Sequence, residues 1–148
     1  MNILVSACLL GVACRYDGKS KPVEWVLDLG DKFTLVPFCP EVYGGLTTPR
    51  LPSEIVGDKV LHNDGTDVTE QYKKGAEEAL RVAKLYNCRY AILKEKSPSC
   101  GKGKIYSGNF DRTLIDGDGI TTRLLTENGI KVFGESEIDL MLEDMQDA

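Results

Sequence analysis

The chain opens with a short apolar run, Ile3-Leu4-Val5, that leads directly into Ser6-Ala7-Cys8. Short runs rich in β-branched residues are typical of strands that are buried on both faces of a sheet. Three more runs of this character follow, at 33–36, 90–93 and 130–133. The sequence therefore predicts four buried strands. Between 53 and 62, Gly57-Asp58 separates two further apolar pairs, which predicts a small β-hairpin outside the main sheet.

Helical patterns lie between these strands. Residues 69–86 carry apolar side chains at helical spacing with Lys and Glu on the other face, and Asp67 and Thr69 supply capping oxygens. Further helices are expected at 121–128 and 137–145 and a short one at 22–29, with loops at 17–21, 40–52 and 97–119. Because strand–helix–strand alternation favours parallel strands, we expect an α/β fold. In detail, the prediction is a three-layer, Rossmann-like open sheet, mostly parallel, forming a single domain over residues 1–148.

Composition narrows the class of protein. The chain has 148 residues with 18 Lys and Arg against 23 Asp and Glu, a net charge of -5. This acidic balance disfavours general nucleic-acid binding, which usually needs a basic surface. No run of about 18 apolar residues predicts a membrane span. The N-terminal residues resemble a first strand rather than an export signal, so we expect a cytoplasmic protein.

The five cysteines are the most informative residues. An odd number in a chain of this size disfavours a disulfide scaffold. Cys8, Cys39 and Cys100 each follow a predicted strand, and the carboxyl ends of parallel strands share the edge of the sheet where ligands bind. We therefore expect these three thiols to converge. Cys88 precedes its strand and is expected to be a buried structural thiol, whereas the placement of Cys14 stays open.

Cysteines in loops can form several kinds of site. A structural zinc usually takes closely spaced ligand pairs, and the chain has no Cys-x-x-Cys pair and only one histidine, His62. That single histidine also disfavours a nucleophilic thiol, which needs a base nearby. Three thiolates suit an iron–sulfur cluster with one iron left free. The alternative is three unrelated cysteines that pack in the core.

Motifs along nearly the whole chain resemble those of the DUF523 family. The segments that carry the resemblance are Ser6–Gly11, Cys14–Gly18, Cys39–Glu41, Gly44–Leu46, Pro49–Pro52, Asp67–Thr69, Leu93–Gly101, Gly119–Thr121 and Val132–Glu135. Some members of that family are thiouracil desulfidases. The resemblance implies an oxygen-sensitive [4Fe-4S] cluster held by Cys8, Cys39 and Cys100, with one open iron. It also implies a non-redox C–S lyase or hydrolase reaction in which thiouracil and water give uracil and hydrogen sulfide.

The resemblance also implies roles for individual residues. It places the catalytic acid/base on Glu41 and an assisting serine on the turn that contains Ser97 and Ser99. For substrate contact we consider the backbone of Gly44 and Gly45, against a plain turn, and the side chain of Arg50, against a structural ion pair with Glu54.

The expected partner is a small thiolated pyrimidine: 2-thiouracil, 4-thiouracil or a thiolated nucleoside. The acidic net charge disfavours thiolated RNA. Two other classes of function remain open: a non-catalytic iron–sulfur or metal-binding module that acts as a sensor or sulfur carrier, and a cluster-free protein. The sequence does not determine the oligomeric state.

Overall fold

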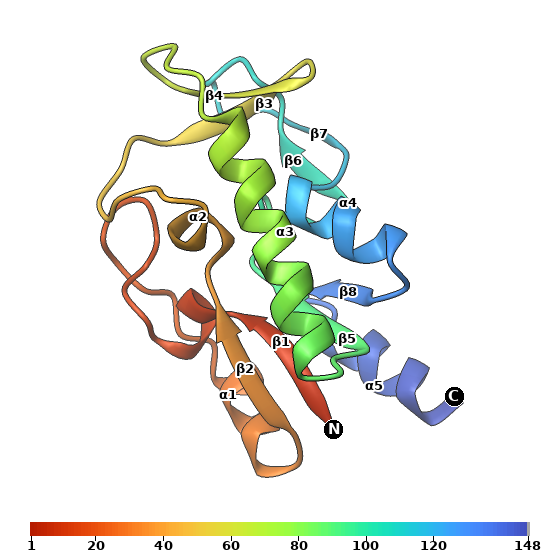
Figure 1. Cartoon of the computed structure of the whole chain (residues 1–148). Coiled ribbons are helices and arrows are strands. Elements are labelled where there is room, and N and C mark those ends of the chain that lie inside the picture. Colours follow the sequence, from red (N-terminus) through yellow and green to blue (C-terminus); the bar gives the residue numbers. More distant parts are fainter. Residues whose placement is uncertain (148) are drawn as a thin grey trace.

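A four-stranded sheet forms the centre of the molecule (Figure 1), seen in a computed structural model that describes residues 1–147. Its strands are β1 (Asn2–Ser6), β2 (Thr34–Phe38), β5 (Tyr90–Leu93) and β8 (Lys131–Gly134), in the order β2-β1-β5-β8. Every pair in this sheet is parallel. These strands overlap the four apolar runs, so the predicted parallel α/β sheet is confirmed.

Helices cover both faces of the sheet. Alternate residues of a strand point to opposite faces, and the buried side chains of β1 divide accordingly. Ile3 and Val5 pack with residues of α1 (Glu24–Leu27), η2 (Asp28–Asp31) and α5 (Ile138–Asp147). Leu4 packs instead with residues of α3 (Thr69–Leu85) and α4 (Ile120–Glu127). Three layers result, as predicted. Among residues 1–147, no helix is long and apolar enough to cross a membrane.

Two antiparallel hairpins lie outside the main sheet (Figure 1). The predicted hairpin is present as β3 (Ser53–Val56) and β4 (Lys59–His62). A second hairpin, β6 (Lys104–Tyr106) and β7 (Leu114–Asp116), occupies part of 97–119. The prediction of a plain loop there was wrong, because these strands are only three residues long and all of β7 is exposed. Short helical turns, η1 (Ala7–Leu10) and α2 (Pro40–Tyr43), were also not predicted, the latter inside the expected 40–52 loop.

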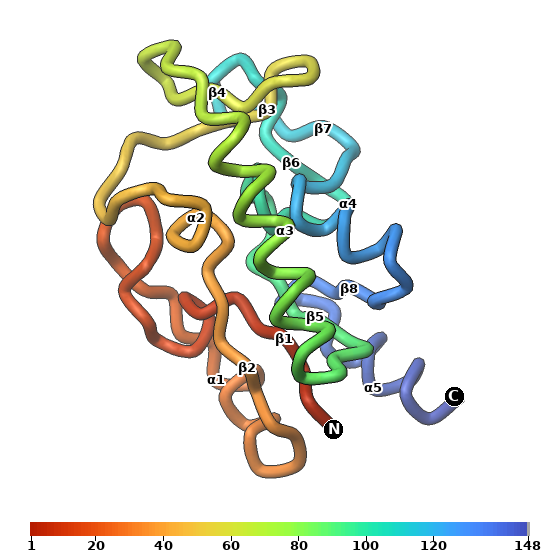
Figure 2. Tube along the Cα trace, in the orientation of Figure 1, coloured from red at the N-terminus to blue at the C-terminus, as the bar shows by residue number. Residues whose placement is uncertain are grey.

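The topology creates a crevice at the carboxyl ends of the strands. From β1 the chain moves to β2 on one side of it and later returns to β5 on the other, which is the kind of switch point where open α/β sheets bind ligands. Figure 2 shows the segment before β3 running beside the loop after β1, and the Arg50 amide donates to the Tyr16 carbonyl there (2.8 Å). Glu54 Oε1 joins the two hairpins by accepting from the amides of Gly108 (2.8 Å) and Phe110 (3.2 Å).

Candidate active site

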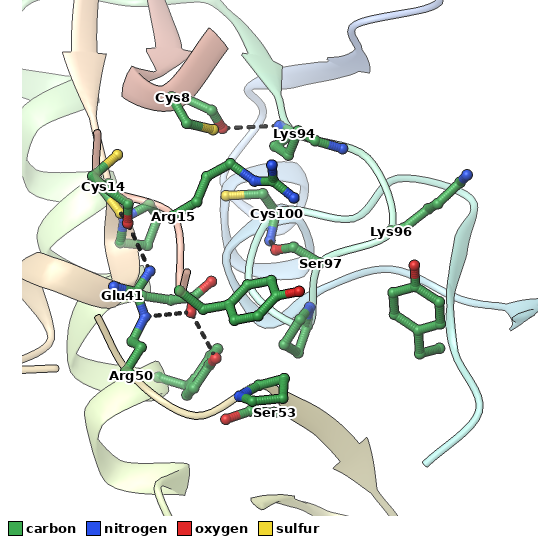
Figure 3. Close-up of a pocket in the computed structure, with 18 of the residues that line it drawn as sticks. Cys8, Cys14, Arg15, Glu41, Arg50, Ser53, Lys94, Lys96, Ser97 and Cys100 are labelled. Carbon is green, nitrogen blue, oxygen red and sulfur yellow. Dashed lines mark hydrogen bonds and ion pairs between the residues drawn. The ribbon is translucent and has the colours of Figure 1, made fainter. Parts of the chain in front are cut away.

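A cavity of about 440 Å³ lies at the carboxyl ends of β1, β2 and β5. Cys8, Cys39 and Cys100, the three thiols expected to converge, all line it, and so does Cys14. Figure 3 shows Cys8, Cys14 and Cys100 around one part of the cavity, with Glu41 and Arg50 below them. The structure therefore brings thiols from three separate strand ends to one space.

Local structure fixes each thiol at the end of its strand. Cys8 lies in η1, which begins directly after β1. Cys39 is the N-cap residue of α2, and Pro40 at the first helical position suits that turn because its missing N–H would have no helical partner. Cys100 follows a turn in which Ser97 Oγ accepts from the amides of Ser99 (3.1 Å) and Cys100 (2.7 Å). Such side-chain bonds to the backbone hold short loops in a defined shape.

Burial and contacts between thiols raise the pKa of three cavity cysteines, Cys14, Cys39 and Cys100. Burial raises the pKa of Cys100 to about 12. The hydrogen bond that the Cys39 thiol donates to Cys14, together with burial, raises the pKa of Cys39 well above the usual range. The bond with Cys39 lowers the pKa of Cys14, but contact with Cys8 and burial outweigh it, so the net pKa is raised. Thiolates at these positions repel one another, and a soft cationic group bound among them would relieve that repulsion.

The chemistry of the thiols that line the cavity fits an iron–sulfur cluster. All five cysteines are free thiols. Within residues 1–147, no group of three or more His, Cys, Asp or Glu side chains is arranged to hold a metal ion. Soft thiolate ligands around one cavity suit an iron–sulfur cluster.

Glu41 lies in α2 at the edge of the cavity, two positions after Cys39. Its Oε1 accepts from Arg50 Nε (3.0 Å) and from the Tyr72 hydroxyl (2.9 Å). Burial alone would lower the pKa of Arg50, but the charge and hydrogen bond of Glu41 raise it. A buried guanidinium therefore stays charged beside this carboxylate, and the pair closes one side of the cavity.

Most N–H groups of the Arg50 guanidinium donate hydrogen bonds to other residues of the protein. Besides Glu41 it donates to the carbonyls of Cys14 (2.8 Å) and Thr47 (3.1 Å) and to the Thr48 hydroxyl (3.1 Å). The alternative pairing of Arg50 with Glu54 was wrong, because Glu54 is turned toward the second hairpin. Contact between Arg50 and a substrate stays a prediction, since most of its N–H groups already have partners.

The other candidate residues divide between the cavity and the surrounding packing. Ser97 lines the cavity, whereas Ser99 is fully buried, pairs with the Thr121 hydroxyl (3.0 Å) and lies outside the lining. Gly44 and Gly45 also lie outside the lining. A Cβ on Gly44 would come within 2.0 Å of the Gln71 carbonyl, so this glycine lets α2 approach α3. Gly45 has a φ of +102°, which favours glycine.

Two cavity residues were missed or left open by the sequence analysis. The helical pattern of 69–86 accounts for Tyr72 only as part of an apolar face, although a buried tyrosine hydroxyl usually has a partner, and here the partner is Glu41. Cys14, whose placement was open, lies among the other thiols. Cys88 is buried in the core between the sheet, α3 and α4, away from the cavity, as expected.

Fold and site together define an α/β protein with a thiol-lined cavity at the switch point of a parallel sheet. The 2-thiouracil desulfurase family model matches residues 3–137, so the chain belongs to that family, and the predicted relationship to DUF523 is confirmed. The chain is 43% identical over 150 residues to the uncharacterized protein YbbK of Bacillus subtilis (strain 168), covering 95% of this chain and 99% of that protein. A solved structure of the [4Fe-4S]-dependent thiouracil desulfidase TudS superposes with a TM-score of 0.94 at 45% identity, covering 99% of both chains.

Proposed function

We propose that this protein is a [4Fe-4S]-dependent thiouracil desulfidase that hydrolyses the C–S bond of a thiolated pyrimidine without net redox change. The observation that carries the proposal is the gathering of Cys8, Cys39 and Cys100, from three strand ends, around one cavity with Glu41. The family membership and the TudS likeness support it. We also propose that residues 1–148 act as one domain, in the cytoplasm, where thiols stay reduced.

In this proposal Cys8, Cys39 and Cys100 hold the cluster as thiolates. A cluster held by three protein ligands would supply one open iron, whose chemistry is that of a soft Lewis acid able to polarise a thiocarbonyl group. Cys14 lies beside these residues and is not assigned as a ligand.

Glu41 carries the proton in the proposed reaction. Its carboxylate accepts a proton from the water that attacks the ring carbon and passes it to the departing sulfur, which takes its second proton from the new hydroxyl as that group becomes the carbonyl. The C–S bond breaks, a C–O bond forms, and thiouracil and water become uracil and hydrogen sulfide with no electron from outside. Ser97 Oγ already accepts two amide hydrogens, so its own O–H remains free to donate to the water or to a ring substituent.

The cavity suits a small substrate. Its volume of about 440 Å³ lies in the range of small-molecule sites, roughly 300–1,000 Å³. With a net charge of -5, the chain favours a free base or a nucleoside over a polynucleotide. Among the residues considered for substrate contact, Arg50 is assigned here to holding Glu41, while Gly44 and Gly45 shape the α2 turn.

The proposal is tested with protein whose cluster is rebuilt under anaerobic conditions. Incubation with 2-thiouracil or 4-thiouracil is expected to yield sulfide and uracil in equal amounts. Glu41→Gln is expected to keep its iron and lose about 10²–10⁴-fold in kcat, the usual contribution of general acid–base catalysis.

Three results would count against the proposal. Protein that binds the cluster but releases no sulfide would indicate a non-catalytic module. Protein that binds no iron after reconstitution would indicate packing cysteines. Full activity of Glu41→Gln would remove the assigned role of Glu41.

A further inference from the structure

The Tyr72 side chain reaches the cavity from the first turn of α3, the long helix that covers one face of the sheet. Tyr72 lies in α3 and is only 2% exposed. Its hydroxyl donates to Glu41 Oε1 (2.9 Å), the same oxygen that accepts from Arg50 Nε (3.0 Å). Two donors from two different segments therefore fix one oxygen of this carboxylate.

The second oxygen of Glu41, Oε2, has no hydrogen-bond partner in the described part of the chain and is available to a ligand in the cavity. Within residues 1–147, no protein group donates a hydrogen bond to Oε2. Every buried side-chain oxygen in these residues has a hydrogen-bond partner, so an oxygen without one is not buried. Oε2 is therefore accessible, which agrees with a Glu41 side chain that is 15% exposed. In Figure 3 the oxygen without a dashed line points toward the side of the cavity that holds Cys100.

Close helix packing makes this contact possible. A Cβ on Gly44 would come within 2.0 Å of the Gln71 carbonyl, and one on Gly75 within 2.0 Å of the Pro40 carbonyl. These two glycines let α2 lie directly against α3, and the Tyr72 side chain spans the remaining distance to Glu41.

The Tyr72 hydroxyl donates to Glu41 and keeps its proton. Burial, followed by the nearby Glu41 carboxylate, raises the pKa of Tyr72 well above the usual range, so the hydroxyl keeps its proton. Ser53 also lines the cavity and pairs with His62 of β4, and its hydrogen bond with Tyr72 lowers the Tyr72 pKa less than burial and Glu41 raise it.

We infer that Tyr72 is a positioning residue for the proposed reaction: its hydroxyl holds Glu41 Oε1 so that Oε2 faces the substrate. The inference rests on the proposed function, because it assigns Tyr72 an effect that passes through Glu41. Arg50 adds a second hydrogen bond and a positive charge, whereas the neutral Tyr72 hydroxyl orients the Glu41 carboxylate.

The experiment compares Tyr72→Phe with Tyr90→Phe in cluster-loaded enzyme. Tyr90 is a matched control because it is also buried and its hydroxyl also donates to a carboxylate, Asp144 Oδ2 (2.7 Å), outside the cavity. Each variant loses one hydrogen bond between a phenol and a carboxylate and keeps its aromatic ring. For Tyr72→Phe we expect kcat to fall about tenfold, as for a hydrogen bond to a charged group, with KM changed by less than about twofold and iron content unchanged. Tyr90→Phe is expected to keep both kinetic constants, and thermal unfolding checks that both variants fold.

A double variant separates this inference from the proposed function. If Tyr72 acts through Glu41, adding Tyr72→Phe to Glu41→Gln lowers kcat no further. A further tenfold loss in that background would overturn the inference, as would wild-type kcat in Tyr72→Phe, or loss of iron or a raised KM in that variant. Wild-type activity of Glu41→Gln alone would instead show that the proposed role of Glu41 fails, and the inference with it.

Discussion

The two ends of the sheet carry the same kinds of residue with different consequences. At the carboxyl end, Cys100 lines a polar cavity and Tyr72 donates to Glu41. At the amino end, Cys88 is buried among apolar side chains and Tyr90 donates to Asp144. The difference teaches that a buried thiol or phenol becomes part of a site through its position relative to the strand ends. Residue type alone does not distinguish the two ends.

The carboxylates at the two ends also differ in their surroundings. Glu41 forms an ion pair with a nearly buried guanidinium, because the Arg50 side chain is only 4% exposed. Asp144 pairs with Lys131, whose side chain is 57% exposed and therefore well screened by water. The carboxyl end thus holds its carboxylate in a fixed direction, while the amino end uses its carboxylate to fasten α5 to β5 and β8.

The largest contrast is expected from the cysteines. Cys100→Ser removes a proposed cluster ligand, so we expect loss of most bound iron and of sulfide release. Cys88→Ala removes a thiol of the core, and we expect normal iron content and activity with a stability loss of about 1 kcal/mol. Iron analysis, visible absorption and denaturant unfolding measure these effects. Equal iron loss in both variants would contradict the assignment of the cluster to the carboxyl end of the sheet.

An intermediate effect is expected from glycine substitutions. Gly75→Ala places a Cβ against the Pro40 carbonyl, which forces apart α2 and α3 and displaces Glu41. We expect a stability loss of about 1–3 kcal/mol and a lower kcat. In the control, Gly30→Ala, the nearest heavy atom would lie 3.7 Å away, an ordinary contact, so stability is expected to change by less than about 0.5 kcal/mol. Unaltered kinetics in Gly75→Ala would mean that the α2–α3 contact does not position Glu41.

The smallest effect is a pH dependence at the amino end. The hydrogen bond from Tyr90, followed by that from Lys131, lowers the pKa of Asp144 below its ordinary value of 3.8. The stabilisation from Asp144 is therefore complete above that value and is lost as pH falls through the lowered pKa. Wild type is expected to be slightly more stable than Asp144→Asn at pH 7, and the two should converge in strong acid, with equal activity at neutral pH. A stability difference that grows in acid would contradict the assignment.

Much of the fold follows from strong local patterns. The four buried strands and the long helix α3 are predictable because each carries a sustained apolar pattern. The hairpin of β6 and β7 and the single turn of α2 are too short, and in β7 too exposed, to produce one. The predicted helix at 22–29 appears as α1 continuing into η2.

The site is predictable only in part. Placing Cys8, Cys39 and Cys100 after strands is enough to expect their convergence, because parallel strand ends meet at one edge. The contact between Tyr72 and Glu41 joins residues 31 positions apart and depends on how closely two helices pack, which no local pattern records. Likewise, only the fold shows that Ser97 faces the cavity while Ser99 is turned into the core.

The most direct test of the central claim is iron-edge anomalous diffraction from crystals of the anaerobically reconstituted protein. Our account predicts one compact group of iron peaks in the cavity, bonded to Sγ of Cys8, Cys39 and Cys100, with Cys14 and Cys88 unbound. Iron bound elsewhere, or held without one of those three sulfurs, would contradict it.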